Sequence, residues 1–353
     1  MQRQNGIRDG GYSLKAPLVS IVIVNWNGKH LLGECLESLR QQTSQDFEIV
    51  LVDNGSRDGS VEYIRERYGE VKLVPLSVNK GFAGGNNVGI RVASGNYIVL
   101  LNNDTKTDPA WLENLIKEAE SNPAAGMVAC KILSYANPDV IDNVGLLIYR
   151  DGLARGKGRL ERDEGQYDQK GEALFPSGCA GLYRKKMLDE TGLFDEEFFA
   201  YADDVDLGLR GRLAGWGCVY VPSAKVYHKY SSSSSSYSSQ KAFLVERNRL
   251  WVLLKYYPVE LIVASVYFTA KRLLLQFYGA LSGRGASGRF TTENSMVHAI
   301  TILLQAWCSA LVAVPHVLRQ RWNFARKRRI GRREFYRLIR EFGISASELA
   351  LKD

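Results

Sequence analysis

Residues 97–108 read YIVLLNNDTKTD, and this stretch decides the fold. Its first five residues are apolar and favour β-structure, which predicts a strand buried on both faces. Asn102, Asn103 and Asp104 follow that strand without a spacer. In an open α/β sheet the ligand crevice lies outside the carboxyl ends of the strands, so these side chains are expected to face a ligand. A carboxylate there can hold a metal ion and, through it, a phosphate.

The same unit, a buried strand followed by polar residues and a helix, recurs on both sides of this stretch. Buried strands are predicted at 19–24, 48–52, 71–76, 97–101 and 126–132, with helices between them. Strands that alternate with helices predict a mostly parallel sheet joined by right-handed crossovers. The predicted fold class is therefore α/β.

Asn and Asp residues end successive strands of this predicted sheet. They are Asn25 and Asn27, Asp53, Asn79, and Asn102 to Asp104. Taken singly, each is best explained as a turn residue. Several such ends on one edge of a sheet instead favour a polar crevice that tolerates phosphate. The dinucleotide pattern GxGxxG is absent after the first strand, and a glycine-rich stretch at 81–89 follows the third.

An acidic turn opens a helix in the second half of the chain, predicted to run from Asp203 to Gly215. Its first turn holds Asp203, Asp204 and Asp206, which the helix dipole alone would favour. The aromatic sequence FFAY directly precedes these acids. An apolar rim raises the pKa of a carboxylate toward the range useful to a general base, so a catalytic role is favoured.

A lone histidine, His228, follows two short strands predicted at 218–221 and 224–227. Without further context such a residue is more often a surface or packing residue than a ligand. The serine tract at 230–240 is either an inert linker or a loop that orders over a bound ligand. Residues 139–171 have little periodicity and predict irregular structure with one hairpin.

The charge of the chain is concentrated near its end. The formal net charge is +8, and residues 319–333 alone contain eight Lys or Arg and no acid. The five cysteines are scattered without a CxxC pair. Free thiols in a reducing compartment fit that pattern, which predicts a cytoplasmic protein. The first eighteen residues lack the apolar core of a signal peptide and are expected to form a polar arm.

Several motifs, taken in order, resemble a known family. They are SIVIVNWNG, VDNGSRDGS, NKGFAGGNNVGI, LNNDT, SGCAGLYRKK, GLFDEEFFAYADDVDLGLRGRLAGW and VYVPSAKVYH, spread over residues 19–230. Their order and spacing resemble the GT-A glycosyltransferases of family 2, in particular the bacterial branch of rhamnosyl- and galactofuranosyltransferases of cell-surface polysaccharide synthesis. The resemblance implies a GT-A fold, with a Rossmann-like, mostly parallel central sheet flanked by helices.

The resemblance also implies which residues bind the nucleotide sugar. They are Asn25, Asn27, Asp53, Lys80, Gly85, Asn87, Asn102 and Asn103. Among them Asp53 would hydrogen-bond a pyrimidine base, with Asn25 and Asn27 beside the nucleoside. Lys80 and the glycine-rich stretch after it would form the loop that faces the ribose and the diphosphate.

The LNNDT motif takes the place of the family's DxD, whose last carboxylate binds a divalent cation, Mn²⁺ or Mg²⁺. Because the first acid of that motif is Asn102 here, Asp104 would hold the metal, and the resemblance makes His228 a second ligand. The family's general base is an Asp before the acidic helix, which makes Asp204 the candidate base and Asp203 the runner-up. One metal site and one base suffice for direct displacement, which implies inversion at the anomeric carbon.

The chain changes character beyond Glu246. Residues 246–258 predict an amphipathic helix, and 259–270 are apolar but too short to span a bilayer, with Lys271 and Arg272 closing them. Residues 300–318 are a longer apolar candidate, followed at once by the cationic run. Polybasic segments beside apolar helices are drawn to anionic lipid, so an appendage on the cytoplasmic membrane face is favoured. A transmembrane helix and a soluble helical pair packed on the core or on another subunit stay open, whereas nucleic-acid binding is disfavoured.

These observations predict a disordered arm (1–17), a GT-A domain (18–240) and a basic helical region (241–353). The domain would divide into a nucleotide-sugar half (18–133) and an acceptor and base half (134–240). The predicted function is metal-assisted, inverting transfer from a dTDP- or UDP-sugar to a hydroxyl of a cell-surface glycan or lipid-linked oligosaccharide, at the inner face of the cell membrane. Transfer to polyprenyl phosphate is the alternative, a non-catalytic sugar-nucleotide-binding scaffold is the rival of another class, and a homo-oligomer stays open.

Overall fold

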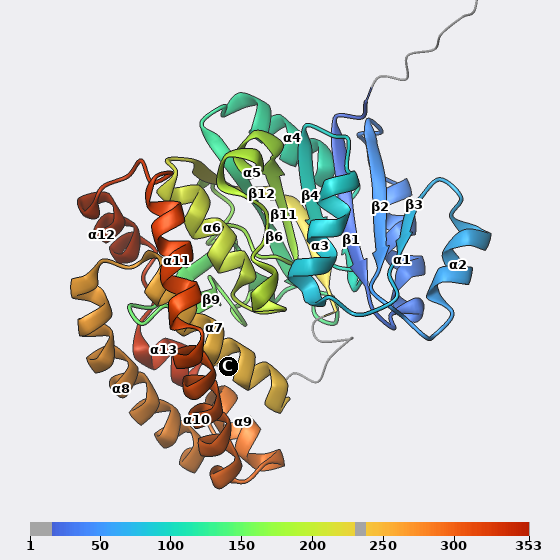
Figure 1. Ribbon diagram of the computed structural model, residues 1–353. Coiled ribbons are helices and arrows are strands. Elements are labelled where there is room, and N and C mark those ends of the chain that lie inside the picture. The colour runs from blue at the N-terminus through green and yellow to red at the C-terminus, as the bar shows by residue number, and fades with distance from the viewer. Residues whose placement is uncertain (1–15, 230–237, 353) are drawn as a thin grey trace, which may run out of the picture.

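A mixed β-sheet forms the centre of the protein, for which the computed structural model describes residues 16–229 and 238–352. Its strands are β1 (Val19–Asn25), β2 (Phe47–Asp53), β3 (Lys72–Pro75), β4 (Tyr97–Leu101), β5 (Thr105–Thr107), β6 (Ala125–Ser134), β7 (Ile141–Asn143), β10 (Gly171–Glu172), β11 (Ala180–Arg184) and β12 (Gly217–His228). The main path runs β10-β12-β6-β11-β4-β1-β2-β3, while β5 pairs with β12 and β7 with β6 (Figure 1). The predicted N-terminal arm up to residue 15 and residues 230–237 of the serine tract lie outside the described residues.

Helices cover both faces of this sheet. They are α1 (Lys29–Arg40), α2 (Ser60–Arg67), α3 (Gly81–Val92), α4 (Trp111–Ser121), α5 (Lys185–Thr191), the short 3₁₀ helix η1 (Glu196–Phe198) and α6 (Asp203–Leu213). On one face α1 and α4 bury Leu36 and Leu115 against the strands. On the other face α3, α5 and α6 bury Ile90, Leu188 and Leu209. The predicted α/β fold with its alternating strands and helices is thus confirmed.

The sheet is parallel apart from β11 near its middle and the short strands β5, β7 and β10, all of which pair antiparallel. β1 pairs in parallel with β2 and β4, β2 with β3, and β6 with β12. β11 is antiparallel to both β4 and β6, with Leu182 opposite Val99 and Val128. The sequence patterns predicted no strand at these residues. The small residues serve close packing there, because a Cβ at Gly181 would lie 2.7 Å from the Cβ of Pro176.

β12 is one long strand, not the two short strands predicted from the sequence. Its pairing with β6 shifts register between Val221 and Lys225. Pro222 lies within this irregular segment, where a missing N–H interrupts no regular ladder. The continuous strand carries His228 to the sheet edge, opposite Thr105 of β5. Nearby, β8 (Leu146–Ile148) and β9 (Ala154–Gly156) form the hairpin that was expected in this region.

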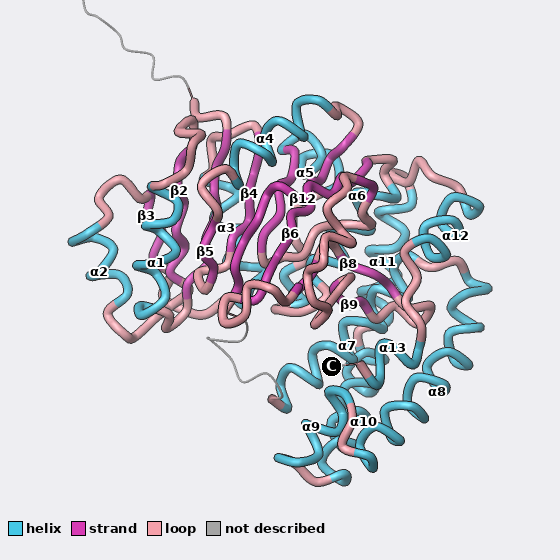
Figure 2. The backbone as a smooth tube through the Cα atoms, turned by 180° about the vertical axis from the view of Figure 1, so that it is seen from behind, coloured by secondary structure: helices cyan, strands magenta, loops and turns pink. Residues whose placement is uncertain are grey.

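A group of helices follows the sheet and lies together at one end of it (Figures 1 and 2). They are α7 (Ser239–Tyr256), α8 (Val259–Ser282), α9 (Gly285–Glu293), α10 (Met296–Val312), α11 (Val314–Ala325), α12 (Arg332–Glu341) and α13 (Ala346–Leu351). α7 begins before the predicted residue 246, and α10 and α11 pack against it. The expectation that Lys271 and Arg272 close an apolar segment is wrong, because α8 continues through both of them to Ser282.

A buried ion cluster joins this helical group to the sheet domain. Arg272 of α8 donates to Asp151, in the β8–β9 hairpin, at 2.7 Å and to Glu246 of α7 at 3.0 Å. Arg249 pairs with the same Glu246, and the indole of Trp307 donates to it at 3.0 Å. Such a cluster holds α7, α8 and α10 in one fixed arrangement on the domain, because a partner lost from it would leave a buried charge uncompensated.

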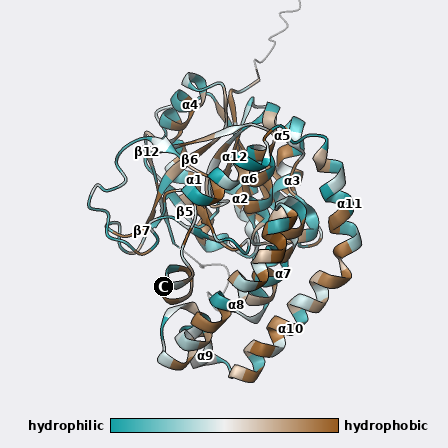
Figure 3. Ribbon diagram, turned by 90° about the vertical axis from the view of Figure 1, so that its left-hand side faces the viewer, coloured by the Kyte–Doolittle hydropathy of each residue, from teal (hydrophilic) through white to brown (hydrophobic). Residues whose placement is uncertain are grey.

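The outer surfaces of the helical group carry apolar stripes. α8 exposes Val259, Val263, Val266, Leu274 and Leu281, and α10 and α11 expose Val297, Ile300, Leu304, Leu311 and Trp322. Figure 3 shows hydrophobic residues along α10 and α11. Within the described residues no single helix is long and apolar enough to cross a membrane. The segments Gly285–Thr291 and Met296–Val312 meet that standard only jointly, with a bend of 118° between them.

Four of the eight cations at 319–333 form side-chain hydrogen bonds or ion pairs with other residues of the protein. Arg321 donates to the carbonyl oxygens of Leu254 and Tyr257, each at 2.8 Å. The others are Arg328, which donates to the carbonyl of Ile330, and Arg329 and Arg332, which pair with Glu190 and Glu260. Part of this run therefore holds α11 and its C-terminal neighbours on the protein.

Candidate functional site

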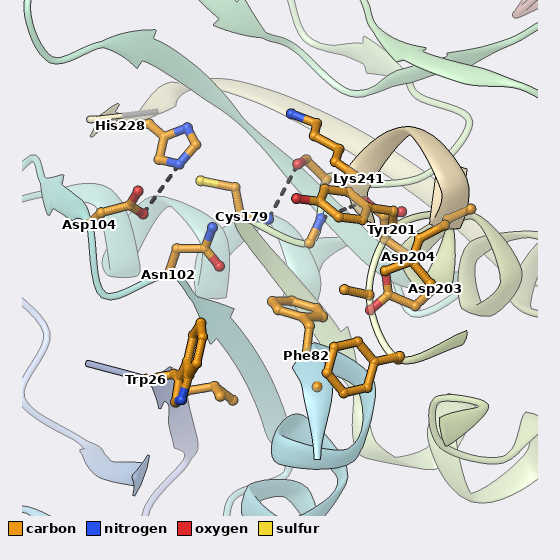
Figure 4. Close-up of a pocket in the computed structure, with 18 of the residues that line it drawn as sticks. Trp26, Phe82, Asn102, Asp104, Cys179, Tyr201, Asp203, Asp204, His228 and Lys241 are labelled. Carbon is orange, nitrogen blue, oxygen red and sulfur yellow. Dashed lines mark hydrogen bonds and ion pairs between the residues drawn. The ribbon is translucent and has the colours of Figure 1, made fainter. Parts of the chain in front are cut away.

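A pocket of about 480 Å³ opens at the carboxyl ends of β1, β2 and β4. Its walls come from the start of α3, the loop at 177–179, the loop at 199–202, the end of β12 and the first turn of α7 (Figure 4). Among the residues predicted from the sequence, those that line it are Asn102, Asn103, Asp104, Asp203, Asp204 and His228. The two halves of the sheet domain and the C-terminal helices thus meet at one cavity.

Asp104 and His228 face each other at one side of this pocket (Figure 4). The Nε2 atom of His228 lies 3.3 Å from Oδ1 of Asp104, and its Nδ1 lies 2.7 Å from Oδ2 of Asp142. Burial opposes the charged imidazole, but the Cys179 thiol and the two carboxylates outweigh it and raise the pKa of His228 well above its usual range. A carboxylate on the far nitrogen of a histidine is the usual support of a metal-binding imidazole. The Asp104–His228 pair therefore fits a divalent cation.

A buried polar network lies behind the floor of the pocket. Nδ2 of Asn103 donates to Asn25 at 2.7 Å, and Nδ2 of Asn25 donates to Asp53 at 3.1 Å. The second carboxylate oxygen of Asp53 accepts from the backbone N–H of Ser56 at 2.9 Å, and Asp53 is only 1% exposed. The network holds the ends of β1, β2 and β4 in register, and Asn103 is its member on the pocket surface.

Asn27 and Lys80 lie in the loops around this floor. Asn27 has a φ of 50°, and its side-chain oxygen accepts from the N–H of Arg57 at 2.8 Å. The backbone N–H of Lys80 donates to Oδ1 of Asn54 at 2.9 Å, and Asn54 itself lines the pocket. Both residues therefore shape the loops that carry pocket residues.

Gly85 and Asn87 lie within α3 and not in a loop that faces a ligand. The amide of Asn87 donates to the carbonyl of Phe194 and to Glu196, each at 2.9 Å, and accepts from the N–H of Phe194. A Cβ at Gly85 would lie 2.7 Å from a methyl carbon of Val24, so the glycine lets α3 approach β1 closely. Both residues thus contribute to packing and lie outside the pocket lining, and their contact with ribose and diphosphate stays a prediction.

The acids Asp203 and Asp204 lie on another side of the pocket, at the start of α6 (Figure 4). Asp204 accepts hydrogen bonds from the N–H groups of Gly178 at 3.0 Å and Val205 at 2.8 Å. Burial raises the pKa of Asp204, although these N–H groups oppose the shift. Burial and the neighbouring Asp204 charge raise the pKa of Asp203 well above its usual range, and its buried Oδ2 has no partner among the described residues. The two environments favour a proton on Asp203 and an oriented carboxylate on Asp204.

Several pocket residues were not anticipated. Asp142 comes from the region at 139–171, where the sequence had no periodic pattern, and Lys241 comes from a turn of α7 that the sequence did not predict. Trp26 lines the pocket and is 45% exposed. An exposed aromatic residue among the polar residues after the first strand was a usable signal for it. Tyr201, from the aromatic sequence before the acids, also lines the pocket.

Comparison with known proteins identifies a family. The glycosyl transferase family 2 model matches residues 20–192. N-acetylglucosaminyl-diphospho-decaprenol L-rhamnosyltransferase of Mycobacterium tuberculosis is 28% identical over 267 residues, which cover 66% of this chain and 86% of that protein. The O-antigen biosynthesis protein RfbC of Myxococcus xanthus is 29% identical over 227 residues, which cover 62% of this chain but only 18% of RfbC.

Two solved structures share the fold. GalNAc-T7, solved with UDP, GalNAc and Mn²⁺, has a TM-score of 0.58 at 19% identity, and the alignment covers 70% of this chain and 49% of the GalNAc-T7 chain. TarS of S. aureus has a TM-score of 0.51 at 17% identity, and the alignment covers 82% of this chain and 80% of the TarS chain. These structural similarities support the fold. The family match and the relatives above support the enzyme class. The chain is a glycosyltransferase whose residues 20–192 match family 2.

Proposed function

We propose that this enzyme moves a sugar of the rhamnose or galactofuranose type from its dTDP or UDP carrier to a hydroxyl of a cell-surface glycan or lipid-linked oligosaccharide precursor, with inversion. The observation that carries the proposal is the meeting of two different groups in one pocket. Asp104 and His228 lie on one side, and the Asp203–Asp204 pair lies on another. The mycobacterial relative, whose name specifies L-rhamnosyl transfer and a diphospho-decaprenol, supports a lipid-linked acceptor.

We place the nucleoside of the donor beside the Asn25–Asp53 network. Asn103 and Asn54 offer amide groups on the pocket surface, and Trp26 offers an exposed indole on which a base can stack. Asp53 lies at the inner end of this network. We retain its contact with a pyrimidine base, which the sequence motif implies, as part of the proposal.

We place the diphosphate next to Asp104 and His228, which would hold a divalent cation, Mn²⁺ or Mg²⁺. The described residues contain no group of three or more acidic, histidine or cysteine side chains arranged around a metal. The donor phosphates and water would therefore supply the remaining ligands. A bound cation would neutralise the charge that develops on the leaving diphosphate. Asp142 orients the imidazole of His228 for this task.

We assign the general base to Asp204. Its carboxylate is fixed by the N–H groups of Gly178 and Val205 and lines the pocket in which the acceptor hydroxyl must arrive. A raised pKa makes it a stronger base than an exposed aspartate, because it binds the acceptor's proton more firmly. Asp203, with the higher tendency to stay protonated, would accompany it as a neutral acid. One base and a leaving group on the opposite side imply a single displacement with inversion.

We further propose that the enzyme is cytoplasmic and lies on the inner face of the cell membrane. The apolar stripes on α8, α10 and α11 would enter the interfacial region of the bilayer, and the exposed cations near them would contact anionic headgroups. α7 connects these helices to the pocket, since its first turn lines the cavity. A lipid-linked acceptor could then reach Asp204 without leaving the membrane surface.

A panel of nucleotide sugars tests this proposal. The full chain is incubated with Mn²⁺ and dTDP-, UDP- or GDP-sugars, and its melting temperature and the release of nucleoside diphosphate are measured. We expect a dTDP- or UDP-sugar to raise the melting temperature and to release its nucleotide when a lipid-linked glycan fraction is added. Release with polyprenyl phosphate alone would move the acceptor to the lipid phosphate. Donor binding without release, with every acceptor, would leave only a binding subunit.

A further inference from the structure

We infer that Asn248 of α7 is a positioning residue for the reaction: it holds the loop at 198–202 in the conformation that presents Asp204 to the pocket. The inference rests on the proposed role of Asp204 as general base. It concerns a residue outside the region matched by the family model and from a helix that belongs to the C-terminal group.

The loop in question has an unfavourable backbone. Phe199, Tyr201 and Ala202 have φ values of 64°, 66° and 59°, in the region that side-chain-bearing residues avoid. All three also line the pocket. A backbone of this kind persists only where the surrounding structure holds it, and such segments cluster at active sites. The question is therefore which groups hold these residues.

Asn248 supplies the main contact from one side. Its Nδ2 atom lies 3.0 Å from the carbonyl oxygen of Phe198, 2.9 Å from that of Ala200 and 2.7 Å from that of Tyr201. Asn248 is fully buried. A single amide group, with two N–H donors, therefore lies within hydrogen-bond distance of three carbonyl oxygens of the loop. Arg247 adds two longer contacts, each 3.1 Å, to Glu197 and Phe198.

The start of α3 closes the loop from the other side. The N–H of Ala83 donates to the carbonyl of Phe199 at 3.2 Å. Gly81, with a φ of 73°, lies so close that a Cβ there would be 2.2 Å from the same carbonyl oxygen. The loop is thus held between a glycine of the nucleotide half and an asparagine of the C-terminal helices.

The loop leads directly into the proposed base. Ala202 is the residue before α6, and its carbonyl accepts from the N–H of Asp206 at 2.9 Å. The direction in which the loop ends therefore sets the first turn of α6 and the place of the Asp204 carboxylate. α7 fixes that turn a second time, because Lys255 and the hydroxyl of Tyr256 bind Asp206 at 2.5 Å and 2.6 Å.

Replacing Asn248 by Leu tests the inference, because leucine has the same branching and number of heavy atoms as asparagine and lacks its N–H donors. We expect kcat for sugar transfer to fall about 10- to 100-fold, as misplacement of a reacting group by about 1 Å does. Donor affinity, measured by calorimetric titration with Mn²⁺ present, should stay within about threefold, because the donor groups lie on other walls of the pocket.

Trp307→Phe is the matched control. It removes a hydrogen bond to Glu246 within the same helical group without touching the loop. Both variants should lower the melting temperature, but only Asn248→Leu should lower kcat. An equal loss of kcat in the control, or wild-type kcat in Asn248→Leu, would overturn the inference.

Two further variants keep the test decisive. If Asn248→Leu does not fold, Arg247→Met removes the outer contacts to the same loop, and a several-fold loss of kcat at unchanged donor affinity is expected; unchanged kcat would overturn the inference. Asp204→Asn separates this inference from the proposed function. If wild type transfers sugar and Asp204→Asn also does, the base assignment fails. If Asp204→Asn is inactive while Asn248→Leu is fully active, only the positioning role fails.

Discussion

His228 at the end of β12 faces Asp104 at the end of β4, with 3.3 Å between Nε2 and Oδ1. The two residues are far apart in the chain and meet because β5, which follows Asp104, pairs with the last residues of β12. Asp142 accepts from the other nitrogen of the ring. The LNNDT motif keeps only the second acid of a DxD pair, Asp104. The structure places the imidazole of His228, supported by Asp142, beside that carboxylate.

Asp142→Asn should weaken Mn²⁺ binding, because an amide holds Nδ1 of His228 less firmly than a carboxylate does. Loss of a supporting partner of this kind costs about 10- to 100-fold in metal affinity. The measurement is a Mn²⁺ titration, by electron paramagnetic resonance, of the protein with UDP or dTDP present. Glu113→Gln is the control, since Glu113 accepts from Thr43 and neither residue lines the pocket. Equal Mn²⁺ affinity in wild type and Asp142→Asn would contradict the metal assignment.

Sugar transfer should lose rate toward acid pH because of Asp204. Its pKa is raised by burial, so it becomes protonated at a higher pH than an exposed aspartate, whose usual value is about 3.9. A protonated Asp204 cannot accept the hydroxyl proton, and kcat should fall about tenfold per pH unit below the raised pKa. The profile of kcat against pH measures this, with tryptophan fluorescence as the check that the protein stays folded. A flat profile down to about pH 4 would exclude Asp204 as the base.

Arg272→Met should destabilise the protein strongly. It leaves Asp151 and Glu246 buried without this cation, and breaking a buried pair in this way costs about 3–5 kcal/mol of unfolding free energy. Denaturant unfolding at neutral pH measures the loss. Lys271→Met is the matched control, because Lys271 is the exposed neighbour on the same helix and should change little. Similar losses in both variants would show that the cluster does not anchor the helices.

The same cluster predicts an effect of acid on stability. Burial opposes the charge of Glu246, but Arg249 and Arg272 outweigh it and lower its pKa to about 2. A carboxylate with a lowered pKa contributes stability above its unfolded value of about 4.3, and that contribution is lost as the pH falls toward 2. The unfolding free energy of wild type should therefore fall over this range more steeply than that of Glu246→Gln. Parallel curves would contradict the assignment.

Binding to lipid should depend on the exposed stripe of α8. The double variant Val266→Glu and Leu274→Glu replaces side chains that are 73% and 70% exposed, so it should leave the fold intact. It should weaken sedimentation with anionic vesicles at least about tenfold, since each side chain would bury apolar area in the bilayer. Val78→Glu, at an exposed valine of the sheet domain, is the control. Undiminished vesicle binding of the double variant would remove α8 from the membrane surface.

Deleting the end of the chain would test the membrane proposal less cleanly. Phe324 of α11 and Phe335 of α12 are buried in the main core. Their loss would expose apolar core surface. Vesicle binding would then change because of that exposed surface, whether or not these helices bind lipid in the intact protein. Point substitutions on exposed stripes avoid that difficulty.

The parallel half of the sheet could be predicted because its signals are local. Each strand there is an apolar run that ends in polar residues, and each helix buries apolar residues at helical spacing. β11 could not be predicted in this way, because its place between β4 and β6 is a tertiary pairing of a short, glycine-containing segment. β12 was predicted as two strands with Pro222 between them. In the structure Pro222 lies in an irregular segment of one continuous strand.

The site divides along the same line. Asp104 and Asp204 could be predicted because each belongs to a local pattern, a strand end or a helix start. Asp142 and Asn248 could not, because they act through contacts with residues far along the chain. Asn87 was expected in a loop because glycine and asparagine usually favour loops, but it lies in a helix. In α3 those small residues allow close packing on β1, and packing outweighs their low helix propensity.

We expect Asp204 to act as base on an acceptor while the donor is held elsewhere in the same pocket. This is tested by measuring the turnover of Asp204→Asn together with its donor affinity, both with Mn²⁺ and the donor that the panel identifies. We expect kcat to fall about 10²- to 10⁴-fold, the usual contribution of a general base, while donor affinity stays within about threefold of wild type. Undiminished turnover, or a loss of donor affinity as large as the loss of kcat, would contradict it.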